Sequence, residues 1–197
     1  MVRQHRQAGF TILETIFVVA LIGVISAIAV PMFGNALSDF RLSGDARSVS
    51  NAVALAKMRA ASRFTRVRLY VDLAGESHHL EYWDKDASSW TADGGTTSLS
   101  SGIAFSYGIV GAPPPSTQAT IGQAPACKDD DGDDIANTAC IMFNSRGVPI
   151  DATLAPTGGG ALYLTDGQAV YGITIAATGM LRTWRTFPLA TPSWTLS

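Results

Sequence analysis

Hydrophobic residues run almost without interruption from Phe10 to Phe33, and Glu14 is the one charged residue in this stretch. A helix needs about 20 such residues to cross a hydrocarbon core of about 30 Å. Residues 1–9 contain two arginines, one histidine and no acid. Because a basic flank stays on the cytoplasmic side, the pattern predicts a single membrane span with the rest of the chain on the far side.

Two simpler interpretations of this apolar segment are a secretory signal and a plain single-pass anchor. The run is longer than the 7–15 apolar residues of a signal peptide, and no small-x-small cleavage site precedes a polar mature start. Glu14 argues against a plain anchor, because a carboxylate at mid-bilayer costs roughly 2.5–3.5 kcal/mol on insertion scales. A carboxylate that merely reaches up to the membrane interface is the alternative explanation of Glu14.

After Pro31 the pattern changes from apolar on all sides to amphipathic. Apolar residues recur at spacings of three and four, which places them on one face of a continuing helix: Leu42, Ala46, Val49, Val53, Ala56 and Ala60. This helix is predicted to end near Ser62–Phe64. Its apolar face is expected to be buried against a β-rich domain.

Strand patterns follow the helix. Residues Arg66–Leu73 alternate strictly between apolar and polar, and Leu80–Trp83 returns after a turn at Gly75. Further strands are predicted at Ile103–Tyr107, Cys140–Phe143, Ala161–Thr165, Ala169–Ala176 and Met180–Arg185, with turns at Asn144–Gly147, Asp166–Gly167 and Thr178–Gly179. A long N-terminal helix packed on an antiparallel β-sheet gives an α+β fold. The expected divisions are 1–9, 10–33, 34–64 and 65–197.

Charge and motifs exclude several classes of function. The chain has 14 Lys+Arg and 16 Asp+Glu, so it is not an overall electrostatic binder of nucleic acid. It contains no Gly-x-Ser-x-Gly elbow, phosphate loop or His-Glu-x-x-His motif. His78 and His79 adjoin without metal-ligand spacing. The sequence therefore does not predict an enzyme. A periplasmic enzyme on a membrane tether is the weakest of the three hypotheses for this chain, after the two that follow below.

The stretch Gly9-Phe10-Thr-Ile-Leu-Glu14, preceded by basic residues, resembles the processing site of type IV prepilins. The resemblance covers about thirty residues and implies the pilin fold. It implies that a membrane prepilin peptidase cuts between Gly9 and Phe10, and that the amine of Phe10 is then methylated. Residues 1–9 would be the prepilin leader, and Glu14 would become the fifth mature residue. Pro31 stands where pilins commonly place a helix-kinking proline.

The same resemblance implies how the subunit assembles. Cleavage creates an ammonium on Phe10, and Glu14 lies at nearly the same depth in the membrane, so each subunit's acid can pair with a neighbour's amine. The expected partners are other pilin or pseudopilin subunits, the prepilin peptidase and the inner-membrane assembly platform. The expected location is the inner membrane, single-pass, with residues 65–197 periplasmic before extraction into a pilus or pseudopilus.

The β-rich part narrows the resemblance. The stretch Ile141–Gly147, followed by paired strands and a Thr-Gly turn near the end, is similar to the GspH/FimT group of minor pilins and pseudopilins. This implies a structural subunit of a type IV pilus or a type II secretion pseudopilus. A major pilin remains an alternative, as does a minor pilin that binds DNA for uptake.

Cys127 and Cys140 are the only cysteines. In an exported domain they are expected to form a disulfide, which pilins commonly carry near the C-terminal region. Such a bridge would stabilise the fold by roughly 3 kcal/mol in the chain-entropy model. Free buried thiols are the alternative.

Between the cysteines lies an acidic loop. Asp129, Asp131 and Asp133 have the alternate spacing that lets carboxylates converge on a hard cation such as Ca2+. The loop lacks the full EF-hand arrangement, because Gly132 stands between the second and third acids. A solvated acidic loop without metal is the favoured interpretation. No other cofactor is expected.

Arg182, Trp184 and Arg185 form a basic, aromatic stretch near the end of the chain. Subunits of the FimT type that capture DNA carry a Gly-Arg-x-Arg core at this end, and here the arginines are displaced and respaced. Phosphate attraction with base stacking on Trp184 is one interpretation. The favoured one is an exposed edge strand protected by charge.

Overall fold

The structure is a computed structural model that describes residues 11–197, so the expected leader, residues 1–9, and Phe10 lie outside the described part. Helix α1 spans Ile12–Arg63. The strands are β1 Val67–Asp72, β2 Ser77–Asp84, β3 Ser89–Ala92, β4 Thr97–Ser98, β5 Thr138–Phe143, β6 Pro149–Ile150, β7 Ala161–Thr165, β8 Val170–Ile175, β9 Leu181–Thr186 and β10 Thr195–Leu196.

The chain divides into two compact units, residues 1–38 and 39–197, and α1 contributes to both. Unit 1 contains the apolar part of the helix. Unit 2 contains helix residues 39–63, the strands named above and a hydrophobic core of its own. The long helix and the antiparallel strands give the α+β fold predicted from the sequence.

The predicted apolar stripe of α1 is confirmed in unit 2. All six of its side chains are fully buried, at 0% exposure: Leu42, Ala46, Val49, Val53, Ala56 and Ala60. They share one core with residues of both sheets, among them Leu69, Phe143 and Ile173. The helix ends at Arg63, within the predicted range, where Phe64 takes a left-handed backbone conformation (φ 52°).

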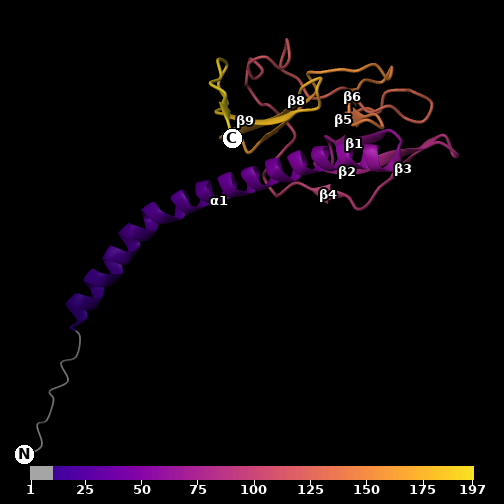
Figure 1. Ribbon diagram of the computed structural model, residues 1–197. Helices are drawn as coiled ribbons and strands as arrows, with labels where there is room; N and C mark the ends of the chain where they lie inside the picture. Colours follow the sequence, from indigo (N-terminus) through magenta and orange to yellow (C-terminus); the bar gives the residue numbers. More distant parts are fainter. Residues whose placement is uncertain (1–10) are drawn as a thin grey trace, which may run out of the picture. The chain divides into compact units, whose positions relative to one another are not determined.

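The first sheet has the strand order β3-β2-β1-β5-β6, with β4 paired to β2 (Figure 1). Its centre is β1, which is antiparallel to both neighbours, with Val67 opposite Tyr82 on one side and Phe143 on the other. Val67, Leu69 and Val71 are fully buried. The alternation read from the sequence therefore gave the correct core face of β1.

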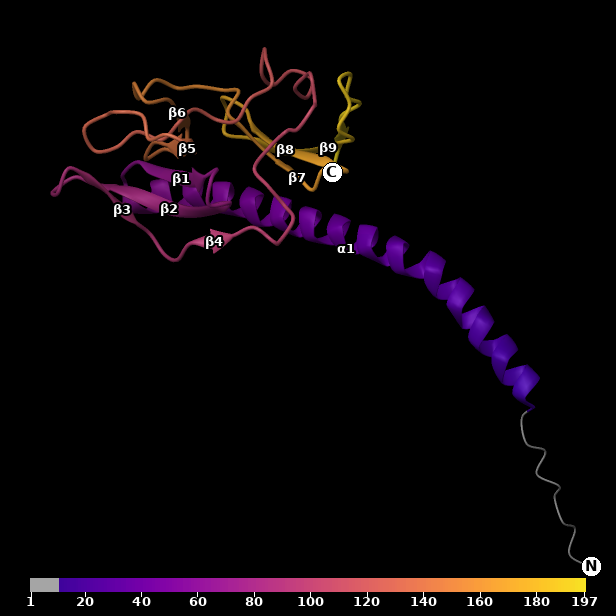
Figure 2. The same ribbon diagram turned by 180° about the vertical axis from the view of Figure 1, so that it is seen from behind.

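The second sheet has the order β10-β9-β8-β7 and is antiparallel throughout (Figure 2). The β7–β8 hairpin turns at the predicted Asp166–Gly167, where the Asp166 carboxylate accepts hydrogen bonds from the backbone N–H groups of Gln168 and Ala169, each at 2.8 Å. Gly167 has φ 86°, a conformation that glycine adopts without strain.

One predicted strand is wrong, and four short strands were not predicted. In Ile103–Tyr107 only Ala104 pairs, through its N–H and C=O with Thr165. Ile103 and Phe105 are nevertheless buried, which explains the alternation that suggested a strand. The strands β3, β4, β6 and β10 have two to four residues, too few to show a period in the sequence.

Two turns, one at Gly147 and one at Gly179, lie against the side chain of Lys57 on α1. The Lys57 ammonium donates to the carbonyl oxygen of Gly179 at 3.0 Å, in the turn between β8 and β9. A Cβ added to Gly179 would lie 2.9 Å from that ammonium nitrogen, and one added to Gly147 would lie 3.2 Å from Lys57 Cγ. Both glycines have positive φ. Lys57 therefore connects the helix to a turn of each sheet.

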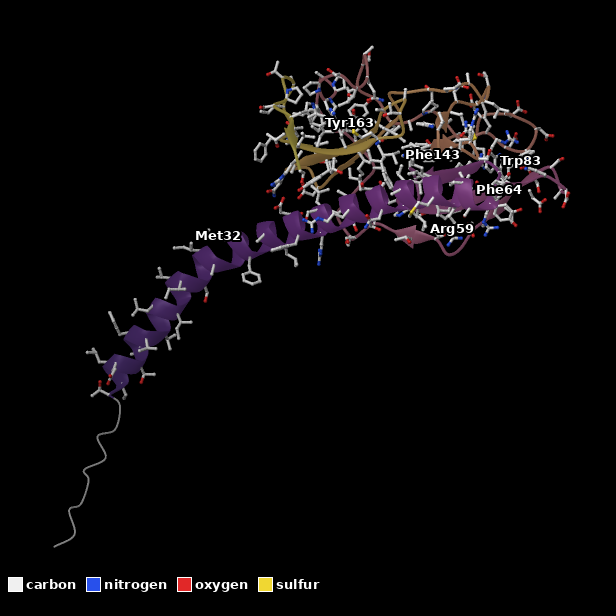
Figure 3. The ribbon with its side chains drawn as sticks, viewed as in Figure 1. Met32, Arg59, Phe64, Trp83, Phe143 and Tyr163 are labelled. Carbon is white, nitrogen blue, oxygen red and sulfur yellow. A yellow bond between two sulfur atoms is a disulfide. The ribbon has the colours of Figure 1, made fainter. Side chains whose placement is uncertain are left out.

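The outer edge of β7 is covered by the segment between β4 and β5. The side-chain amide of Gln123 donates to the carbonyl oxygen of Tyr163 and accepts from its N–H, both at 2.9 Å. Ala124 N–H donates to Ala161 C=O, and Ala104 pairs with Thr165. Tyr163 itself is fully buried and lies in the interior of the unit (Figure 3). This side of β7 is thus hydrogen-bonded along its length.

Cys127 and Cys140, expected to pair, form a disulfide across 13 positions of sequence. Cys140 lies on β5, and its N–H donates to Pro125 C=O at 2.8 Å. Cys127 N–H donates to the Thr138 hydroxyl at 2.9 Å. The bridge therefore holds the acidic loop against the edge of β5.

We expect Lys57→Met to lower the free energy of unfolding by about 1–2 kcal/mol, because the variant leaves the Gly179 carbonyl without its charged donor. The measurement is urea unfolding of the full chain in detergent, with the disulfide intact. Arg47→Met, at an exposed position of the same helix, should change stability by less than about 0.5 kcal/mol. Equal losses in the two variants would contradict the role given to Lys57.

The paired substitution Cys127→Ser with Cys140→Ser should destabilise unit 2 by about 3 kcal/mol, since the unfolded chain regains the entropy of the closed loop. Guanidinium unfolding of the double variant measures this, against the wild type with and without reductant. The reduced wild type should match the double variant. A stable wild type under full reduction would show that the bridge contributes little.

Candidate functional site

The first turn of α1 has the geometry of a capped helix start. Thr11 stands just before the helix, and its hydroxyl accepts a hydrogen bond from the Glu14 N–H at 3.2 Å. Its carbonyl oxygen accepts from the Thr15 N–H at 3.1 Å. Threonine followed three residues later by glutamate is the spacing of a capping box. Thr11 therefore fixes the helix start and places Glu14 in its first turn.

The Glu14 carboxylate lies at the positive end of the helix dipole, which favours a negative charge in the first turn by about 0.3–1 kcal/mol at exposed sites. Within residues 11–197 this carboxylate makes no hydrogen bond or ion pair, and the residue is exposed. In lipid the dipole offsets only part of the roughly 2.5–3.5 kcal/mol cost of a buried acid. An external cation would supply the rest.

The helix after Glu14 is apolar on every side. Phe17, Ile25 and Met32 are 65%, 64% and 69% exposed (Figure 3). The helix is long and apolar enough to cross a membrane. Within the described residues, no other part of unit 1 covers these side chains.

The predicted processing site, Gly9 and Phe10, lies outside the described residues. Pro31 lies inside α1, which continues through it without a break. Proline removes one backbone hydrogen bond from a helix interior, so the predicted kink at Pro31 stays a prediction.

The structure does not bring the proposed calcium ligands together. Among the described residues, no group of three His, Cys, Asp or Glu side chains is arranged to hold a metal ion. The Asp129 carboxylate instead accepts hydrogen bonds from the N–H groups of Asp131 and Asp133, at 3.0 and 2.8 Å. Asp129 thus shapes the loop as a turn would, and calcium binding stays an untested prediction.

The geometry of the C-terminal strand does not favour DNA stacking. Trp184 is only 7% exposed, and its indole N–H donates to the Thr174 hydroxyl at 3.0 Å. Arg185 is held by an ion pair with Asp39 of α1 at 2.6 Å. Of the three residues, Arg182 alone is exposed. The strand β9 pairs with β8 on one side and with β10 on the other, so the favoured interpretation of an exposed edge strand at Trp184 and Arg185 is wrong.

The two adjoining histidines lie on opposite faces of β2. His78 is 4% exposed and packs edge-on against Phe105, and burial lowers its pKa below the ordinary value. His79 stacks on Tyr70 and contacts the Glu81 carboxylate at 3.2 Å. They share no site, so these histidines do not form a catalytic pair.

Sequence reasoning missed Thr11 as a functional residue. The signal was present, since Thr-x-x-Glu before an apolar run is a known helix-start pattern. It also missed Lys57, for which the sequence holds no signal because the contact joins segments more than a hundred residues apart.

Known proteins match this chain in two ways, one by structure over most of its length and one by sequence over its N-terminal segment. No curated protein sequence matches it. A crystal structure of the minor pseudopilin EPSH from the type II secretion system of Vibrio cholerae aligns over 80% of this chain and 97% of its own, at 14% identity and a TM-score of 0.46. A second structure of EpsH from Vibrio cholerae covers 80% and 96%, at 12% identity and 0.38. These values are too low to carry an argument about function.

The N-terminal segment gives the informative match. Residues 4–30 match the prokaryotic N-terminal methylation motif. The match includes the capped first turn with Glu14 and most of the apolar span, the two features that the geometry singles out. The chain therefore carries a prokaryotic N-terminal methylation motif at residues 4–30.

Proposed function

We propose that the chain is a structural subunit of a type IV filament, a minor pilin or pseudopilin of the GspH/FimT type that assembles through the N-terminal part of α1. The observation that carries the proposal is the first turn of that helix. The Thr11 hydroxyl accepts there from the backbone N–H of Glu14, and the Glu14 carboxylate has no partner in residues 11–197, at the start of a span that is apolar on all sides. The methylation motif over residues 4–30 supports the same role.

Processing comes first in this proposal. A membrane prepilin peptidase would cut between Gly9 and Phe10 and expose a new amine, which is then methylated. The amine would lie one residue before Thr11, close to the helix start. The helix dipole is positive at that end, so it disfavours the subunit's own ammonium there. The amine is therefore expected to pair with an acid of another subunit.

Assembly would then match charges between subunits. The amine of Phe10 in one subunit and the Glu14 carboxylate of its neighbour are both costly alone in lipid, and together they form a charge-assisted hydrogen bond. The match between the two groups sets how far neighbouring helices are displaced along their axes. The apolar side chains of residues 15–33 would pack against other helices in place of lipid.

The location follows from the same features. Residues 39–197, with a disulfide and their own core, would lie on the periplasmic side, where disulfides form and persist. The inner-membrane assembly platform would extract the subunit into the filament. The role is structural, and no residue of the chain is assigned to a chemical reaction.

Mass spectrometry of the protein from a host with its own assembly machinery should find a mature chain that begins with N-methylated Phe10. Gly9→Val should leave the leader attached, because a branched side chain replaces hydrogen next to the scissile bond. Ala8→Val, one position earlier, is the control and should be processed. A mature protein that begins at another residue would contradict the proposal.

Glu14→Gln should be processed and retained in the membrane, and its amount in sheared filaments should fall about tenfold or more, since it loses the charge that pairs with a neighbour's amine. Immunoblots of the sheared and membrane fractions measure both quantities. Asp133→Asn removes one acid from the exposed loop and should assemble normally. Filament incorporation of Glu14→Gln at the wild-type level would rule out the charge-pairing mechanism.

A further inference from the structure

Unit 2 contains a cavity of about 610 Å³ that the filament proposal does not use. It lies on the face of the first sheet that points away from α1, beneath the acidic loop and the segment 149–160. Its volume falls within the range of about 300–1,000 Å³ that is typical of sites for small ligands and short segments. The charges on its walls indicate what it can bind.

One wall is basic and aromatic. The Arg66 guanidinium lies over the Trp83 ring, 4.3 Å from its centroid, and 5.6 Å from that of Trp90. Arg68 lies over the Trp90 ring at 4.0 Å, and the two indoles meet edge to face at 5.3 Å. Trp83 on β2, labelled in Figure 3, is the direct pairing partner of Trp90 on β3. The wall is therefore a packed stack with two guanidinium groups.

The two arginines differ in their partners. Arg68 is 3% exposed, pairs with Glu81 at 2.5 Å and also donates to Lys128 C=O. The Arg66 guanidinium makes no hydrogen bond or ion pair with any residue from 11 to 197. Partial burial and then the nearby Arg68 charge lower the pKa of Arg66, as expected for a cation without a compensating acid. Its in-plane donors are free for a carboxylate.

The acidic loop lines the same cavity next to this wall, and again one group is free. Asp129 bonds the loop backbone, and the Asp130 carboxylate accepts from Trp90 N–H at 2.7 Å. The Asp131 carboxylate is exposed and has no side-chain partner in the described part of the chain. One unpaired cation and one unpaired anion therefore line the same cavity. Apolar side chains, including Met142 and Ile150, line the same cavity.

We propose that this cavity is a peptide-binding site for a segment of another polypeptide that places an acidic side chain on Arg66 and a basic side chain on Asp131. The apolar residues of the cavity would contact the intervening residue of the peptide. Arginine stacked on tryptophan presents a planar fork that matches a carboxylate. The site is independent of the filament role, since none of its residues lies in unit 1.

A saccharide fits these walls less well. Sugar rings stack on open aromatic faces, and here Trp83 and Trp90 each carry an arginine on one face and meet each other edge to face. A purely anionic ligand such as a phosphate would meet the uncompensated charge of Asp131 in the same cavity. A ligand with both signs of charge and an apolar centre satisfies every wall, and a polypeptide is the macromolecule that supplies all three.

The test uses the full chain in detergent micelles and the peptide acetyl-Lys-Leu-Glu-amide. Three matched peptides replace lysine, glutamate or both by glutamine. Tryptophan fluorescence gives the affinity, and the indole N–H resonances of Trp83 and Trp90 report the place of binding. We expect the doubly charged peptide to bind at least tenfold more tightly than the neutral one, with each charge contributing.

Substitutions then assign each charge to its residue. Arg66→Met should abolish the preference for glutamate over glutamine and keep the preference for lysine, and Arg66→Lys should restore part of the first. Asp131→Asn should abolish only the preference for lysine. Arg47→Met and Asp133→Asn, outside the cavity, are the controls. Near-UV circular dichroism confirms that each variant is folded.

Four outcomes would overturn the proposal. The neutral peptide binds as tightly as the charged one, or no peptide binds at millimolar concentration. Arg66→Met weakens all four peptides equally, which would make it a structural residue. Chitohexaose shifts the Trp83 and Trp90 resonances while the peptides do not, which would make the cavity a saccharide site.

Discussion

Three of the six buried residues on the α1 stripe, Ala46, Ala56 and Ala60, are alanines, so the backbone of the helix approaches the strands closely there. Both sheets contribute to the core that encloses this stripe. The sheets of unit 2 thus pack on one face of the helix. The helix depends on the sheets in turn, because an amphipathic helix is stabilised mainly by the packing of its apolar face. Lys57 and the Arg185–Asp39 pair add polar contacts at two further points along it.

The same helix meets a second environment in unit 1, where the chemistry is reversed. Side chains are apolar all round, and the single acid is placed at the helix end that tolerates it best. Within α1, residues 12–33 form a surface that any apolar neighbour can cover, whereas residues 42–60 carry an apolar stripe that packs on one fixed partner, the two sheets. In the proposed function, this change would allow other helices to replace lipid around residues 12–33, while the packing of residues 42–60 stays the same.

The helix, its buried face and the strands with clear alternation could be predicted, because each depends on a local period that the sequence shows directly. Glu14 could be singled out from the sequence, because an acid in an apolar run stands out without any knowledge of contacts, and its role in assembly stays a prediction. The contacts of Lys57, Gln123 and Arg66 could not be predicted, since each depends on the register between strands and on loops with no period. The wrong strand prediction at Ile103–Tyr107 has the opposite cause. Alternate residues of this segment are buried as in a strand, but only Ala104 pairs with another segment.

The hydrogen bonds between Gln123 and Tyr163 protect the outer edge of β7, which matters in the proposed filament. A strand with free backbone groups is a template on which an identical chain can add, and a polymer holds identical or related domains near one another for long periods. The Gln123 amide imitates a peptide group and occupies the positions that an added strand would use. The sheet is thereby closed on that side, so in the proposed filament this edge would not add a strand from a neighbouring domain.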